Sequence, residues 1–204
     1  MGIIQDTVKT SNVANVVNNA ILEYKTKYKS KYDVISKFVD PTKLTFTIAK
    51  IEGNFSPKAF NPETEAKAKN SNVSPSRGLF QFQEATIKTT YLSMFKKDIK
   101  IDTAFIQSFV TDVRLQTLLE LELQYITFVA IEKNGNKLNS IYEGCLTEIK
   151  NELALDNQDI NCVRYYLTHA QGIGAIYDKN ASNSVILFYP FYFLGTYLYV
   201  KQFA

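Results

Sequence analysis

Glu52 stands at the end of an apolar run. Leu44, Ile48, Ile51 and Phe55 recur at spacings of four, three and four residues, which predicts one face of a helix that ends near Glu52. An apolar flank and the C-terminal end of a helix both disfavour an ionised carboxylate. A glutamic acid that keeps its proton is a general acid, and cleavage of a glycosidic bond requires such an acid at the leaving oxygen. The same residues also fit a partly exposed glutamate at a helix end.

The helix that must position Glu52 has clear boundary signals. Asp40 can serve as its N-cap, Pro41 suits the first helical position, and Gly53 is a natural residue just past the last turn. Residues 56–77 contain three prolines and many Asn, Ser and Lys residues, which predicts a long loop.

Helical spacing dominates the rest of the chain, and no convincing alternating strand, repeat or low-complexity tract interrupts it. We therefore predict a mainly α fold. The further helices are expected over residues 8–38 (one or two helices), 82–97, 103–133, 138–155, 157–170 and 182–202, with a turn at 133–137 and a helix end at Gly172 and Gly174.

The composition is that of an ordinary globular protein. Hydrophobic residues make up 46% and charged residues 21% of 204 residues, enough for one domain with a sizeable core. The net charge of +3 is small and unclustered, so no nucleic-acid partner is expected. Cys145 and Cys162 lack the spacing of a zinc or thioredoxin-like site, and two buried free thiols are favoured over a disulfide. We expect no metal and no cofactor.

No export signal or membrane span is evident. The first ten residues lack a basic segment followed by an apolar one, and Asp6 stands where a myristoylation pattern needs Ser or Thr. The apolar run 185–200 is short and contains Pro190 and Gly195, so a buried aromatic helix is favoured there and a membrane partner is not expected. A membrane-active protein that uses this run is a weaker alternative.

Three short segments carry the strongest functional signal in the sequence. They are IAKIEGNFSPKAFNP at 48–62, SRGLFQF at 76–82 and YYLTHAQGIGA at 165–175. Together they resemble the three signature segments of the lytic transglycosylase family, whose domain is like goose-type lysozyme. The second segment is similar to the family's Gly-Leu-Met-Gln turn. The third stands in place of an Ala-Tyr-Asn-Ala-Gly segment and is closer to phage-type versions with His in the Tyr position. The resemblance covers residues 44–176 and implies a lysozyme-like helical domain.

The resemblance also implies roles for single residues. Glu52 matches the catalytic acid/base. Gln81 matches the groove residue that holds a sugar N-acetyl group, and Phe80 matches its apolar neighbour. His169, the single histidine of the chain, takes the place of the Tyr that approaches the catalytic Glu. Tyr165 precedes it by four residues, so both can face one groove.

This chain departs from the family at two of these segments. Gly53 stands where the family commonly has Ser after the catalytic Glu, and His169-Ala170 replace a Tyr-Asn pair. An insertion-like loop at 62–76 lengthens the gap between the first two segments.

The implied function is cleavage of the β-1,4 bond between N-acetylmuramic acid and N-acetylglucosamine in peptidoglycan glycan strands. A transglycosylase needs one carboxylate, and Asp98, Asp102 and Asp112 are candidate partners by their place in the sequence alone. Two alternatives stay open: a hydrolytic muramidase on the same fold, and a non-catalytic peptidoglycan-binding or virion structural protein.

The expected organisation is an N-terminal helical extension over 1–39 and a lysozyme-like catalytic domain over 40–204. A packing arm of the domain is the alternative for the N-terminal segment. The substrate places the protein at the bacterial cell wall, in the periplasm or outside the cell. Without a visible signal peptide, we expect delivery by a phage particle, release through a holin-like pore, or export by dedicated machinery, with a virion or secretion component as a possible partner.

Overall fold

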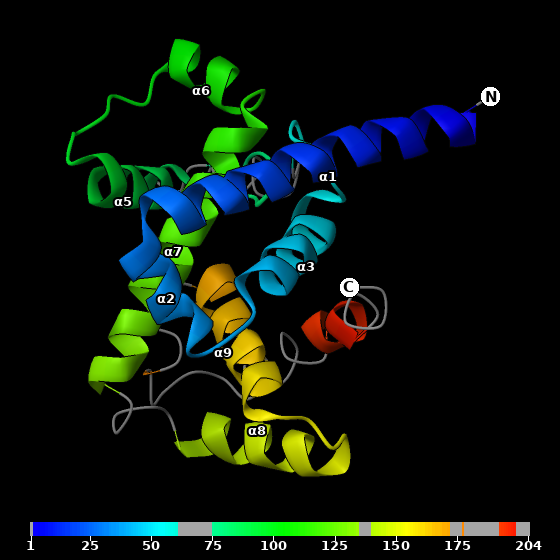
Figure 1. Ribbon diagram of the computed structural model, residues 1–204, viewed down its shortest axis with the longest axis vertical. Coiled ribbons are helices and arrows are strands. Elements are labelled where there is room, and N and C mark those ends of the chain that lie inside the picture. The colour runs from blue at the N-terminus through cyan, green and yellow to red at the C-terminus, as the bar shows by residue number, and fades with distance from the viewer. Residues whose placement is uncertain (1, 61–74, 135–139, 172–176, 178–191, 199–204) are drawn as a thin grey trace. The chain divides into compact units, whose positions relative to one another are not determined.

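The computed structural model describes residues 2–60, 75–134, 140–171, 177 and 192–198, with the backbone alone for 2–11, 141 and 171. This part of the chain is mainly helical (Figure 1), which confirms the mainly α class. Its β pairing is limited to two isolated bridges, Phe60 with Arg77 and Arg77 with Phe82. The helices are α1 (Gly2–Lys27), α2 (Lys29–Ser36), α3 (Pro41–Gly53), α5 (Glu84–Phe95), α6 (Thr103–Phe109), α7 (Val113–Asn134), α8 (Ser140–Glu152) and α9 (Asn157–Gln171).

Two compact units make up the chain. The first unit contains Met1–Lys29 and Thr45–Leu123, and the second contains Ser30–Leu44 and Gln124–Ala204. The division falls within α3 and α7, whereas the sequence suggested a boundary between residues 39 and 40. Residues 1–29 group with residues 45–123, as a packing arm of the domain would.

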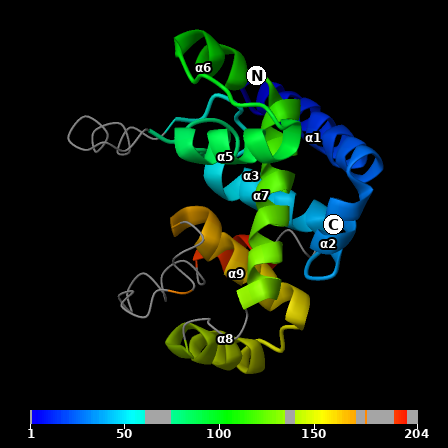
Figure 2. The ribbon, with the colours of Figure 1, turned by 90° about the vertical axis from the view of Figure 1, so that its left-hand side faces the viewer.

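The C-terminal half of α1 belongs to the core of the first unit. Val17, Ile21 and Tyr24 are buried, and the Tyr24 hydroxyl donates a hydrogen bond of 2.8 Å to Glu122 Oε2. Ser93 Oγ donates to the other carboxylate oxygen of Glu122 at 2.5 Å. These bonds join α1 and α5 to the first part of α7. Figure 2 shows α1 beside this part of α7. A partner for both carboxylate oxygens is what a buried carboxylate requires.

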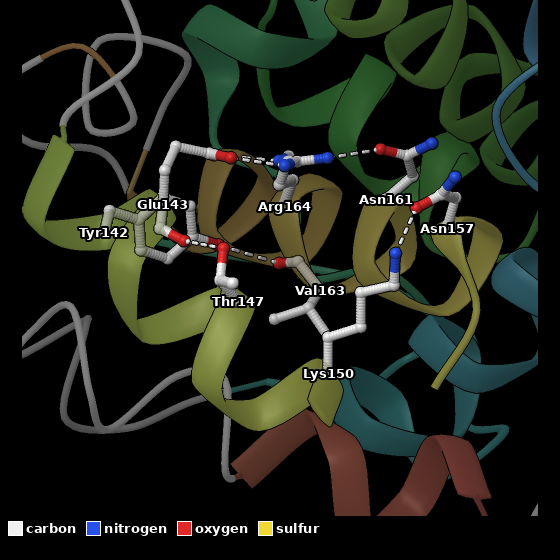
Figure 3. Close-up of polar contacts among 8 residues, drawn as sticks. All are labelled: Tyr142, Glu143, Thr147, Lys150, Asn157, Asn161, Val163 and Arg164. Atoms are coloured by element: carbon white, nitrogen blue, oxygen red, sulfur yellow. Dashed lines mark hydrogen bonds and ion pairs between the residues drawn. The ribbon is translucent and has the colours of Figure 1, made fainter. Parts of the chain in front are cut away.

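In the second unit, a network of polar side chains joins α8 to α9 (Figure 3). Arg164 forms two bonds to the Glu143 carboxylate, and its Nη1 donates to Asn161 Oδ1 at 2.7 Å. Lys150 Nζ donates to Asn157 Oδ1 at 2.7 Å. A two-bond arginine–carboxylate pair fixes orientation as well as distance, so it sets how these helices pack.

Aromatic residues fill the core of the second unit. Phe128 stacks on Phe38 with ring centroids 5.0 Å apart. It also stacks on Tyr165, with ring centroids 5.9 Å apart. A helical stretch over 192–198 places Phe193 5.0 Å from Tyr166. This stretch is the described part of the helix expected over 182–202.

The structure tests the predictions on the cysteines and on a membrane span, and several other predicted segments lie outside the described residues. Cys145 and Cys162 are free thiols, as favoured; Cys162 is buried, which raises its pKa to about 12, whereas Cys145 is half-buried. No helix in the described ranges is long and apolar enough to cross a membrane. Most of the loop 62–76, the turn at 133–137, Gly172, Gly174 and most of the run 185–200 lie outside the described residues.

Candidate functional site

The helix that carries Glu52 begins and ends close to where its sequence predicts. Asp40 Oδ1 accepts the backbone N–H groups of Thr42 at 2.9 Å and Lys43 at 3.2 Å, which confirms the N-cap. Leu44 and Ile48 are buried, and Glu52 is half-buried in the last turn of α3. Glu52 thus stands at the edge of the core.

The chain leaves α3 through two left-handed residues. Asn54 has φ 45° and Phe55 has φ 58°, while Gly53 is still helical. The Phe55 N–H donates back to the carbonyl of Ala49 at 3.1 Å. Left-handed backbone is costly for a bulky residue such as phenylalanine, and such strain gathers at functional sites.

Gly53 brings the end of α3 into backbone contact with the Gly78–Gln81 turn. A Cβ atom built on Gly53 would lie 2.5 Å from the carbonyl oxygen of Leu79 and 3.0 Å from its Cα. No side chain fits at that distance from a backbone atom. The structure therefore accounts for glycine where the family has serine, and it brings the residue that follows Glu52 against the turn formed by the second segment.

The turn itself is held in an unusual conformation. Gly78 has φ 83° and Gln81 has φ 50°. Two bonds between Arg77 and Phe82, of 3.0 and 2.9 Å, close the turn, and the Gly78 N–H donates to the carbonyl of Ala59 at 2.9 Å. Of the five non-glycine residues with positive φ in the described chain, Asn54, Phe55 and Gln81 belong to this site.

The Gln81 side chain supports the turn from inside. Its Nε2 donates to the carbonyls of Ala59 at 3.0 Å and Gly78 at 2.9 Å. Its Oε1 is buried, and within the described part of the chain no donor reaches it. Most buried polar atoms have a hydrogen-bond partner, so this oxygen is an exception among the described residues.

Gln116 on α7 is a positioning residue that sequence reasoning missed. Its Oε1 accepts the Leu79 N–H at 2.5 Å, and its Nε2 donates to the carbonyls of Phe109 at 2.8 Å and Pro57 at 3.3 Å. A Cβ atom built on Gly78 would lie 2.5 Å from the same Oε1 atom, so this position also needs glycine. One fully buried amide thus ties the turn, the loop after α3 and the end of α6 together. A polar residue amid the leucines of α7 was the available signal.

Comparison with known proteins adds no relative. No family model, curated protein or solved structure matches this chain. The resemblance to the lytic transglycosylases therefore stays with the three short segments.

Burial changes the expected roles of two site residues. Phe80 is 0% exposed, and its ring centroid lies 5.8 Å from that of Phe82. Tyr165 is also 0% exposed, between Phe128 and His169. The resemblance gave Phe80 and Tyr165 places in a substrate groove, but neither ring presents surface to a ligand, because each fills the core beneath its segment.

His169 is partly exposed near the end of α9, with its ring stacked 6.4 Å from Tyr166 and tilted 6.0 Å from Tyr165. It belongs to the second unit, and Glu52, Phe80 and Gln81 belong to the first. The structure brings the first two segments together and leaves the approach of His169 to Glu52 a prediction.

The three candidate partner carboxylates serve the local backbone. Asp102 Oδ1 accepts the Phe105 N–H at 3.0 Å as the N-cap of α6, and Asp112 Oδ1 accepts the Leu115 N–H at 2.8 Å before α7. Asp98 Oδ1 accepts the N–H of the next residue at 2.9 Å. Each has a structural reason for its position that involves no substrate.

Proposed function

We propose that this protein is a peptidoglycan lytic transglycosylase in which Glu52 acts as both acid and base. The observation that supports it most is the backbone contact between Gly53 and Leu79. This contact joins the residue after Glu52 to the Gly-Leu-Phe-Gln turn of the second segment, which supports a site formed by both segments. The left-handed residues on both sides of this contact support a functional site over ordinary packing.

In the proposed reaction, Glu52 donates its proton to the oxygen that leaves C1 of N-acetylmuramic acid, and the C1–O bond breaks. The ionised Glu52 then accepts the proton of the C6 hydroxyl of the same sugar, whose oxygen attacks C1. The products are a 1,6-anhydro sugar end and a free 4-hydroxyl on N-acetylglucosamine. The family resemblance assigns the N-acetyl group beside the cleaved bond to Gln81, which is partly exposed on the turn.

A hydrolytic muramidase is the nearest alternative. An inverting hydrolase needs a second carboxylate to activate water. Asp98, Asp102 and Asp112 are each bonded to nearby backbone N–H groups, which favours the transglycosylase reaction.

The substrate lies in the bacterial wall, and delivery by a phage particle, a holin-like pore or a secretion machine is part of the proposal.

Purified sacculi test this assignment. We expect Glu52→Gln to lower the rate of clearing by about 10²–10⁴-fold, as for loss of a general acid. Glu152→Gln is the matched control, because Glu152 also ends a helix but is exposed. Mass analysis of the released muropeptides should find 1,6-anhydro ends. Reducing ends would favour the muramidase, and equal clearing by the parent and Glu52→Gln would refute the site.

A further inference from the structure

Arg77 differs from the other two arginines of this chain. Arg114 forms a two-bond pair with Glu23, and Arg164 forms one with Glu143. Arg77 has no carboxylate partner among the described residues. Its guanidinium lies instead over the ring of Phe60, 5.3 Å from the ring centroid.

The base of the Arg77 side chain is rigidly placed. The residue forms bridges with Phe60 on one side and Phe82 on the other. Its backbone N–H and carbonyl both bond to Phe82, at 3.0 and 2.9 Å. Arg77 directly precedes Gly78, so it borders the turn that contacts the end of α3. A backbone held this way fixes the point from which the side chain extends toward a ligand.

The surroundings of this guanidinium suit an anionic ligand. Arg77 is partly exposed and Phe60 is 41% exposed, so the pair is open to solvent. Stacking on an aromatic ring orients the planar guanidinium, and its five N–H donors match the two oxygens of a carboxylate. An arginine that is oriented but unpaired retains these donors for a ligand.

We propose that Arg77 and Phe60 form a carboxylate-binding subsite that selects peptidoglycan strands by the acidic groups beside the cleaved bond. The inference rests on the proposed function. Two sources supply that chemistry: the carboxylates of the stem peptide, and the lactyl carboxylate of muramic acid once the peptide is removed. A charge-assisted two-bond contact predicts that binding depends on Arg77 and weakens with salt.

Binding is measured in the Glu52→Gln background, which separates recognition from cleavage. Three glycan preparations serve as probes: peptide-bearing strands, peptide-free strands with free lactyl carboxylates, and peptide-bearing strands with all carboxylates amidated. We expect Arg77→Gln to weaken binding about tenfold or more to a carboxylated preparation, and less than about twofold to the amidated one. Loss on peptide-bearing strands assigns the stem peptide, and loss on peptide-free strands assigns the lactyl group.

Two further variants guard the interpretation. Lys58→Gln removes the same charge from an exposed lysine before Phe60 and should change binding less than about twofold. Arg77→Lys keeps the charge but loses the fork, so it should recover part of the affinity. Thermal melts check that each variant stays folded.

Equal binding by Arg77→Gln and its parent on all three preparations, or an equal loss with Lys58→Gln or on amidated strands, would overturn the subsite. Those outcomes leave the Glu52 assignment intact. Absence of binding to every preparation by the parent would overturn the subsite and the proposed function together. Cleavage that persists in Glu52→Gln, with binding still dependent on Arg77, would contradict the proposed catalytic role alone.

Discussion

Gly53, which follows Glu52, is in backbone contact with Leu79 of the second segment. We predict that Gly53→Ala destabilises the protein by about 1–3 kcal/mol, because the new methyl group would collide with the Leu79 carbonyl oxygen, 2.5 Å away. The melting temperature should fall by about 2–10 °C. Clearing of sacculi should fall more than the loss of folded protein accounts for, since the backbone shift would move Glu52.

Gly144 provides the matched control. It lies in α8, and a Cβ there would meet nothing within 4 Å. Gly144→Ala should raise the free energy of unfolding by about 0.5–1 kcal/mol through helix propensity. If both variants shift the melting temperature in the same direction, the steric reason for Gly53 is wrong.

At the scale of elements, a surface ion pair fastens α1 to α7. Arg114 donates to both Glu23 oxygens, with Nε at 2.6 Å and Nη2 at 2.5 Å, and Lys27 Nζ lies 2.8 Å from Oε1. Chiefly through the Arg114 bonds, and then that of Lys27, the pKa of Glu23 falls from 4.5 to about 2. A carboxylate with a lowered pKa stabilises the folded state above its unfolded pKa, and this contribution disappears as the pH falls toward 2.

We predict that Arg114→Gln lowers the free energy of unfolding at pH 7 by about 0.5–1 kcal/mol, since the pair is partly exposed and screened. The difference between parent and variant should shrink as the pH falls from 4.5 to 2. Urea unfolding at several pH values measures it. Lys88→Gln, at an exposed site on α5, removes the same charge and should keep a constant difference. A constant difference for Arg114→Gln as well would show that this pair does not link stability to pH.

At the scale of the whole molecule, residues 1–29 are part of the first unit. We predict that deleting them unfolds that unit. Burial of Val17, Ile21 and Tyr24 contributes about 1.5–3 kcal/mol for each side chain. Their sum is comparable with the whole stability of a domain, about 5–15 kcal/mol. Circular dichroism and hydrogen exchange in α5 and α7 measure the loss.

Paired substitutions on α1 test the same point in the full chain. Ile21→Ala removes a side chain that is 2% exposed and should cost about 2–5 kcal/mol. Leu22→Ala removes one that is 53% exposed and should change stability by less than about 0.5 kcal/mol. A truncated protein that melts like the full chain would favour an N-terminal extension over a packing arm of the domain.

The sequence by itself determined the helical class, the start of α3 at Asp40 and the position of Glu52 in its last turn. These features depend on local forces, since a cap bonds within three residues and a helical stripe repeats within four. The same local reading placed α8 and α9 within a few residues of their observed ends. It placed Gly53 just past the last turn, whereas Gly53 is the last residue of α3.

Only the tertiary structure decided what those residues touch. The contact of Gly53 with Leu79, the bonds of Gln116 to three separate segments and the pair of Tyr24 with Glu122 join residues far apart in the chain. No local pattern encodes such pairs, because they depend on how whole elements pack. For the same reason only the structure shows that Phe80 lies in the core. It also shows that the Arg77 guanidinium lies over Phe60, without a carboxylate partner among the described residues.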